Sequence, residues 1–286
     1  MVTMSICVVL LLLGIVATVA WGRQEFTVPE FGPPDSTDSV GWAARKYVWH
    51  LMVAVVSGAI AGLLVAGAGG RLAMRLLAET AGEAAAGRAT EGNEIVGKIT
   101  LHGSAELVMF GVIIGVATGL IYVLIRPWLP AGRWGGLVFG LLMVAVATHG
   151  MPLDPANPDF DIVGPGWVSV AVFAALALLH GMLVAALAGR YTHAAPVMAR
   201  TRRSALGHLP MLAVLPVFPV YLGFAVGAGG YVLLTRPAFA PLLRAVHSRP
   251  ALLGGRALLA LLLLAAVPGS ISTVVDIAGW PDPSSS

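Results

Sequence analysis

Two arginines, Arg71 and Arg75, stand four residues apart at the end of a long apolar stretch. Residues at this spacing lie on the same face of a helix. An arginine fork binds phosphate or carboxylate oxygens through paired N–H groups, so the pair predicts a phosphate or lipid-headgroup site. Ordinary pairing with Glu79, Glu83 or Glu106, or side chains that reach toward the membrane surface, would explain the same spacing.

His180 is the one ionisable side chain that the sequence places well inside an apolar stretch. A charge there is expensive, so such a residue is a candidate for ligand binding or proton transfer. A neutral imidazole hydrogen-bonded to a neighbouring helix is the simpler interpretation, and we favour it. His149 lies near a helix end rather than at matching depth, so haem held by two histidines is not indicated.

A weaker candidate site combines histidines with carboxylates in the polar segments expected on one side. Imidazole nitrogens and carboxylate oxygens are common ligands of divalent cations. The acidic loop lacks the ligand positions and the glycine of an EF-hand, and a solvated loop is the favoured interpretation. The candidate metal ligands are His102, His149, Asp154, Asp159 and Asp161.

Several catalytic signatures are missing from the sequence. It contains no P-loop, no GxSxG nucleophile motif and no HExxH zinc motif. Its single cysteine, Cys7, excludes an internal disulfide and CxxC chemistry. The net charge is +3 and the basic residues are scattered, so no nucleic-acid surface is indicated. These features favour a non-catalytic protein and identify no cofactor.

Seven long apolar stretches must position these side chains. Hydrophobic residues make up 58% of the 286 residues and charged residues 11%, well below the roughly 25% charged residues of a soluble domain. A transmembrane helix needs about 20 mostly apolar residues. The sequence therefore predicts an all-α integral membrane protein, a polytopic bundle of about seven transmembrane helices. The stretches are 4–22, 48–69, 105–125, 135–151, 166–188, 209–234 and 257–275.

The polar breaks divide the chain into an anchor, a linker and a multi-pass domain. The first apolar run has no Lys or Arg before it, which favours a retained anchor over a cleaved signal peptide. The β-branched run at 94–101 is typical of a short strand. The predicted units are an anchor at 1–22, a Pro/Asp-rich linker at 23–47, a membrane domain at 48–280 with an extramembrane segment at 70–104, and a disordered tail at 281–286.

The distribution of Lys and Arg predicts orientation, because basic loops stay in the cytoplasm. The loop 152–165 carries none and is expected outside, whereas 189–208 carries four arginines and is expected inside. The stretch 209–234 creates a conflict. A single crossing would place the four arginines of 235–256 outside, whereas a re-entrant path, suited to its prolines and glycines, would keep them inside. Length favours the single crossing.

Small residues recur at every fourth position in several stretches. Helices in lipid associate through close backbone approach, so these ridges predict tight packing, with the second and third helices face to face. The same faces would suit dimerisation, but packing within one chain is the favoured interpretation. The predicted packing residues are Gly58, Gly62, Gly111, Gly115, Gly119 and Gly181.

Pro268 followed by Gly269 and Ser270 predicts a break or a kink in the last helix. Taken together, the residues favour a binding, transport-like or accessory subunit of a membrane complex. Its expected partners are the lipid bilayer and another membrane protein or a second copy. The alternative is an integral membrane enzyme acting on a lipid or isoprenoid, with the two arginines on phosphate. The excess of Arg over Lys, 15 to 2, together with abundant Gly and Ala, suggests a bacterial plasma membrane.

Overall fold

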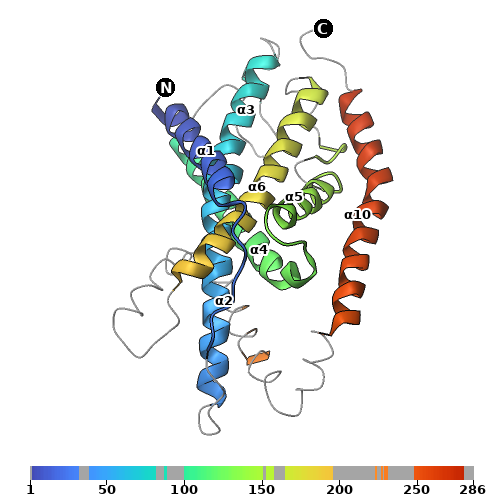
Figure 1. Cartoon of the computed structure of the whole chain (residues 1–286). Helices are drawn as coiled ribbons and strands as arrows, with labels where there is room; N and C mark the ends of the chain where they lie inside the picture. The colour runs from blue at the N-terminus through green and yellow to red at the C-terminus, as the bar shows by residue number, and fades with distance from the viewer. Residues whose placement is uncertain are drawn as a thin grey trace.

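A computed structural model of the protein describes residues 2–31, 39–81, 87–88, 100–150, 153–157, 165–195, 223, 227, 229–230 and 248–279. All regular structure in these ranges is helical (Figure 1), which confirms the all-α prediction for the described part of the chain. The elements are α1 (Val2–Trp21), α2 (Ser39–Ala61), the π segment η1 (Gly62–Gly67), α3 (Ala68–Thr80), α4 (Leu101–Ile125), the 3-10 turn η3 (Arg126–Trp128), α5 (Arg133–Ala147), α6 (Gly166–Ala194) and α10 (Arg249–Ala278).

Five helices in the described ranges are long and apolar enough to cross a bilayer. They are α1, the continuous helix formed by α2, η1 and α3, then α4, α6 and α10. The helix α5 has 15 residues, about 22 Å at 1.5 Å per residue, less than the roughly 30 Å of a bilayer core. The predicted count of seven is therefore not confirmed, whereas the membrane character of the chain is supported.

The second span is much longer than the sequence predicted. Helical structure begins at Ser39, inside the predicted linker, and continues to Thr80, inside the predicted extramembrane segment. Gly69 and Gly70, at the expected end of the second apolar stretch, lie within α3, where Gly69 faces leucine side chains of α1 and α6. Burial between neighbouring helices thus offsets their low helix propensity. Residues 94–99 of the predicted strand lie outside the described part.

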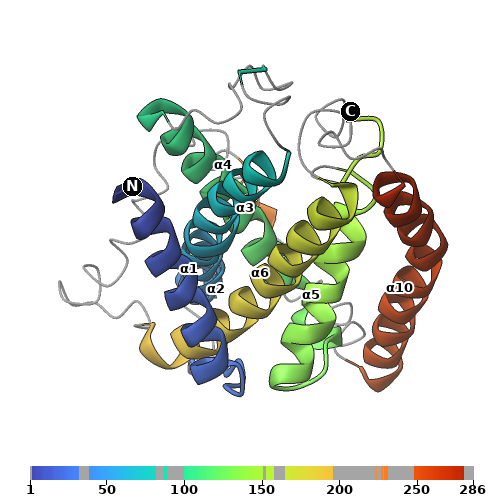
Figure 2. The same cartoon turned by 90° about the horizontal axis from the view of Figure 1, so that it is seen from above.

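The helix α6 runs through the centre of the bundle. It contacts α1, α2, α3, α4, α5 and α10. Seen from above, it lies between α1 and α3 on one side and α5 on the other, with α10 at the outer edge (Figure 2). Leu183 and Val184 of α6 are fully buried and join Trp49, Val65 and Phe139 in the largest apolar cluster.

Glycines bring the backbones of α2 and α4 into direct contact. A Cβ added to Gly115 would lie 2.7 Å from the Cα of Gly62, and one added to Gly58 would overlap the carbonyl oxygen of Gly115. A Cβ on Gly111 would lie 2.6 Å from the backbone nitrogen of Gly67. A similar approach joins α5 to α6, where a Cβ on Gly181 would lie 2.6 Å from the Cα of Gly140. Any side chain at these positions must push two helices apart.

The position of α10 bears on the conflict over the sixth stretch. Near its start, Gly255 lies against Trp128 at the end of α4, and near its end Ile277 lies against Gly166 at the start of α6. Hence α10 is antiparallel to α6 and begins at the end of the bundle where α6 finishes. A single crossing between these two helices does not fit that arrangement, and the path of 209–234 itself stays a prediction. Most of 209–234 lies outside the described residues.

Basic side chains gather at this same end, which we name the arginine-rich end. Arg126 ends α4, Arg133 begins α5, Arg190 is near the end of α6, and Arg249 and Arg256 are in the first turns of α10. The continuous helix from Gly41 to Thr80 is about 60 Å long, about twice the apolar core of a bilayer. One or both of its ends must therefore extend beyond that core.

Of the break and the kink that the sequence allowed at Pro268, the structure excludes the break, because α10 continues through Pro268. Proline removes one backbone donor, and a helix tolerates this when neighbouring groups hold it in place. Here Thr148 at the end of α5 supplies two contacts. Its hydroxyl lies 2.7 Å from the Ser270 hydroxyl, and its carbonyl accepts a hydrogen bond from Thr273 at 2.9 Å.

Gly115→Leu should destabilise the protein strongly, because a leucine cannot occupy the contact between α2 and α4. Overpacking a tight core costs about 1–3 kcal/mol and sometimes more, so the melting temperature in detergent should fall by several degrees. Gly254→Leu is the matched control, because that glycine is exposed in α10 and has no atom within 4 Å of an added Cβ. Equal melting temperatures for the two variants would contradict close packing at Gly115.

Single cysteines in a Cys7→Ser background test the direction of α10. We expect an impermeant maleimide to label Arg249→Cys from the same side of the membrane as Arg133→Cys, and from the opposite side to Ala156→Cys. All three positions are exposed. Labelling of positions 249 and 156 from one side would restore the single crossing and reject the antiparallel arrangement.

Candidate functional site

Arg71 is a buried cation near the start of α3. Only 8% of the residue is exposed, and its Nε and Nη2 atoms are buried without a hydrogen-bond partner. The π segment η1 lies directly before α3. A π turn contains more residues than an α turn. This wider turn sets which face of α3 points inward and so contributes to the burial of Arg71.

The turn of α3 that carries Arg71 packs against apolar side chains of α1, α4 and α6. The Cys7 thiol of α1 lies within reach of its electrostatic field. On the two residues just before it, a Cβ added to Gly69 would meet Leu11 and Leu176, and one added to Gly70 would lie 3.9 Å from the Leu107 side chain. No carboxylate within the described ranges forms an ion pair with Arg71.

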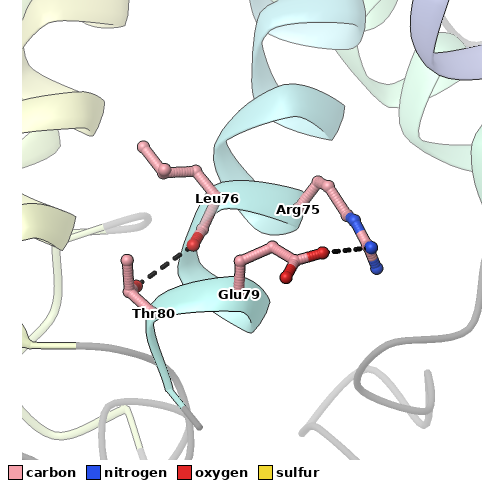
Figure 3. A network of polar contacts seen from close by, with 4 residues as sticks. All are labelled: Arg75, Leu76, Glu79 and Thr80. Atoms are coloured by element: carbon pink, nitrogen blue, oxygen red, sulfur yellow. Dashed lines mark hydrogen bonds and ion pairs between the residues drawn. The ribbon is translucent and has the colours of Figure 1, made fainter.

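Arg75 differs from Arg71 although it lies on the neighbouring turn. It forms an ion pair with Glu79, four residues further along α3, and both side chains are well exposed (Figure 3). Thr80 donates a hydrogen bond to the Leu76 carbonyl on the same turn, at 3.1 Å. An exposed pair of this kind contributes about 0–1 kcal/mol. The two arginines therefore do not share one clamp, and the anion-binding potential resides in Arg71.

His180 lies at the centre of the bundle, 5% exposed. Its Nε2 is 2.8 Å from the hydroxyl of Thr118 on α4. The same hydroxyl lies 2.9 Å from the carbonyl of Gly115. On the other side, the ring faces the carbonyl of Ala61, the last residue before η1, although Nδ1 makes no hydrogen bond of normal geometry. The imidazole is thus held by a neighbouring helix, as the simpler interpretation predicted.

The single proton of the Thr118 hydroxyl permits two arrangements. If Thr118 donates to the Gly115 carbonyl, His180 donates from Nε2 and its Nδ1 is a bare acceptor facing the Ala61 carbonyl. If Thr118 donates to Nε2, the ring carries its proton on Nδ1 and directs it toward that carbonyl. In the second arrangement Nε2 accepts from the Thr118 hydroxyl and the Nδ1 proton faces the Ala61 carbonyl. Both ring nitrogens then face a complementary group, so we favour it. In both arrangements the ring is neutral.

The candidate metal ligands that the structure describes are each engaged locally. His102 pairs with Glu106 on the exposed first turns of α4, at 3.1 Å. Nδ1 of His149 lies 2.8 Å from the Ala145 carbonyl, and the Asp154 carboxylate accepts from the backbone of Ala156 at 2.9 Å. Asp159 and Asp161 lie outside the described residues. Within the described ranges, no three His, Cys, Asp or Glu side chains form a metal-binding group.

An aromatic cluster at the arginine-rich end was not anticipated from the sequence. The Arg126 guanidinium lies 4.4 Å from the centre of the Phe26 ring and donates to the Phe26 carbonyl. Phe26 and Phe31 both pack edge-on against Trp49, which is fully buried. These contacts fix the segment after α1 against α2 and α4. The signal was the pair of aromatic residues in a segment otherwise polar enough to resemble a linker.

Comparison with family models, with curated proteins and with solved structures finds no match to this chain. The functional argument therefore depends on the chemistry of the residues. Two buried polar features are candidates for a functional position. One is the charge of Arg71, which has two nitrogens without acceptors, and the other is the hydrogen-bonded group of His180 and Thr118.

Thr118→Val should destabilise the protein, because the buried His180 ring loses its partner on α4. Leaving a buried polar group unsatisfied costs about 1–3 kcal/mol, and the melting temperature in detergent should fall accordingly. Thr118→Ser keeps the hydroxyl and should retain most of the stability. If both variants melt together, the hydrogen bond to His180 contributes nothing measurable.

Proposed function

We propose that this multi-pass membrane protein is a non-catalytic binding or accessory subunit that holds an anionic ligand at Arg71. The observation that carries the proposal is an arginine that is more than nine-tenths buried and has two guanidinium nitrogens without acceptors. The ligand chemistry that fits is a phosphate or carboxylate group. Such a group supplies the missing acceptors and the missing negative charge together.

The energetic argument begins with the cost of the empty site. An uncompensated charge in a protein interior or at membrane depth costs several kcal/mol, because the lost hydration is not replaced. An apolar residue of similar volume would avoid that cost. A negative oxygen ligand removes it through short, charge-assisted hydrogen bonds, and the planar guanidinium can form two of these in parallel.

The enzymatic alternative is supported less well by the described residues. A lipid-modifying enzyme would need an acid or a base beside the phosphate held by Arg71. The described candidates, His102, His149 and Asp154, are each engaged with a neighbour on their own helix or loop. His180 is bound to Thr118 in the bundle centre. Binding alone requires none of these groups.

The proposed location is a bacterial plasma membrane, with the arginine-rich end in the cytoplasm. Basic residues near span ends favour that side. The outer face of α10 carries exposed leucines at positions 253, 258 and 261, which suit contact with lipid or with another membrane protein. In this orientation Arg71 lies in the half of the bundle that faces away from the cytoplasm.

Arg71→Gln should abolish stabilisation of the detergent-purified protein by anionic ligands. A ligand that binds only the folded state stabilises it by about 2.7 kcal/mol at 100 times its Kd, so the wild-type melting temperature should rise on adding anionic lipid or phosphate. The Gln variant should show no rise, because the amide cannot supply the charge or the fork. Thermal unfolding followed by intrinsic fluorescence measures the shift.

Arg75→Gln is the matched control, one turn along the same helix and already paired with Glu79. It should respond to the ligand as the wild type does. A response lost equally in both variants would show a diffuse surface charge effect instead of a site. Chemical turnover of added lipid that depends on Arg71, detected by mass spectrometry, would favour the enzyme.

A further inference from the structure

We infer that the anionic ligand of Arg71 is the phosphate of a membrane phospholipid, taken from the leaflet opposite the arginine-rich end. This inference rests on the proposed function and names its ligand class. Three observations carry it: the depth of Arg71 in the bundle, the side chains along the adjacent turn of α3, and the number of free N–H donors on the guanidinium.

The depth of Arg71 follows from the helices around it. Its neighbour on α1 is Cys7, about 8 Å along the axis from Val2, and α3 continues about 13 Å beyond Arg71 to Thr80. The Leu107 side chain beside Gly70 lies about 9 Å from the start of α4. The Arg71 backbone is therefore about one and a half to two and a half helical turns below the helix ends.

That depth matches the edge of the hydrocarbon layer. The polar headgroup regions add only about 5–7 Å on each side of a 30 Å core. A long arginine side chain can reach from just inside the core to the phosphates at its edge. Lipid phosphates are always present at that level, whereas a soluble anion must leave water and cross an apolar layer to arrive there.

The turns of α3 beyond Arg71 indicate where the apolar layer ends. Met74 is three residues after Arg71, on the neighbouring part of the helix surface, and 49% of it is exposed. Leu76 is 45% exposed. The ion pair of Arg75 and Glu79 follows further toward the helix end. The exposed apolar side chains suit the hydrocarbon layer and the charged pair suits the headgroup layer, so the Arg71 backbone lies about one turn inside the edge of the hydrocarbon.

The guanidinium has the donors for one phosphate. Nε and Nη2 both lack acceptors, and these two N–H groups lie on one edge of the fork. That edge presents parallel donors at the spacing of two oxygens of one phosphate group. A phosphodiester carries two free oxygens, so a phospholipid satisfies both nitrogens without further groups from the protein.

The test compares three soluble probes on protein exchanged into a delipidating detergent. They are dihexanoyl phosphatidylglycerol, which has short acyl chains, glycerol phosphate, which has the headgroup chemistry alone, and inorganic phosphate. Thermal shift titrations give an apparent affinity for each. We expect the short-chain lipid to bind at least about tenfold more tightly than either soluble anion, because only the lipid gains the apolar contacts.

Variants assign the binding to Arg71. Arg71→Gln should weaken the apparent affinity for the short-chain lipid by about tenfold or more. Arg71→Lys should weaken it by an intermediate factor, because it keeps the charge and loses the fork. Arg75→Gln should weaken it by less than about twofold. Native mass spectrometry of the wild type should show one retained phospholipid. If Arg71→Gln does not fold, the Arg71→Lys variant and competition among probes on the wild type still decide.

The outcomes separate the lipid inference from the proposed function. Equal binding of all three probes with dependence on Arg71 keeps the anion site and overturns the lipid inference. Binding of the short-chain lipid that is unchanged in Arg71→Gln and Arg71→Lys overturns both. Failure of every probe to bind wild-type protein, with no phospholipid retained in native spectra, also overturns both.

Discussion

The backbone contact between α2 and α4 determines how the centre of this bundle is built. Lipid provides no hydrophobic force that drives one helix against another, so association depends on close packing and on polar bonds between helices. Glycines at Gly58, Gly62, Gly111 and Gly115 allow the two backbones to meet without side chains between them. A single added carbon at any of these positions would separate the helices and shift the polar groups of the interior that depend on their spacing.

The contact also positions the polar groups of the interior. Gly115, which lies against Gly58, has its carbonyl beside the Thr118 hydroxyl, and Thr118 in turn holds His180 on α6. His180 faces the carbonyl of Ala61, directly before the π segment. One line of polar atoms thus links α4, α6 and α2 where no water is expected. Because each link depends on helix spacing, the bonds hold the spacing that the glycines permit.

Hydropathy was sufficient to predict the helices but not their ends or their neighbours. The second apolar stretch was expected to end at Gly69, and Pro268 to break or kink the last helix, because sequence shows propensity and not the side chains that pack around a residue. In the folded chain leucines cover Gly69, and Thr148 holds the turns after Pro268. Local rules fail at such positions because tertiary contacts contribute more than propensity.

The candidate residues show the same limit. The depth of His180 could be read from the sequence, but its partner Thr118 is 62 positions away, and no periodicity connects them. The spacing of Arg71 and Arg75 predicted a common face, yet one turn of helix separates a buried guanidinium from an exposed ion pair. Charge patterns alone could not reveal that difference, because it depends on how α3 packs against the neighbouring helices.

Arg71 is the position where folding and function make opposite demands. If stability were the only requirement, an apolar side chain would serve better, since replacing buried charges by well-packed apolar groups is often neutral or stabilising. Arg75, by contrast, has a partner and an exposed position, and its charge costs little. The two arginines lie on the same helix, but only Arg75 has a partner that offsets the cost of its charge. A buried cation whose donors are free is therefore best explained by what binds it.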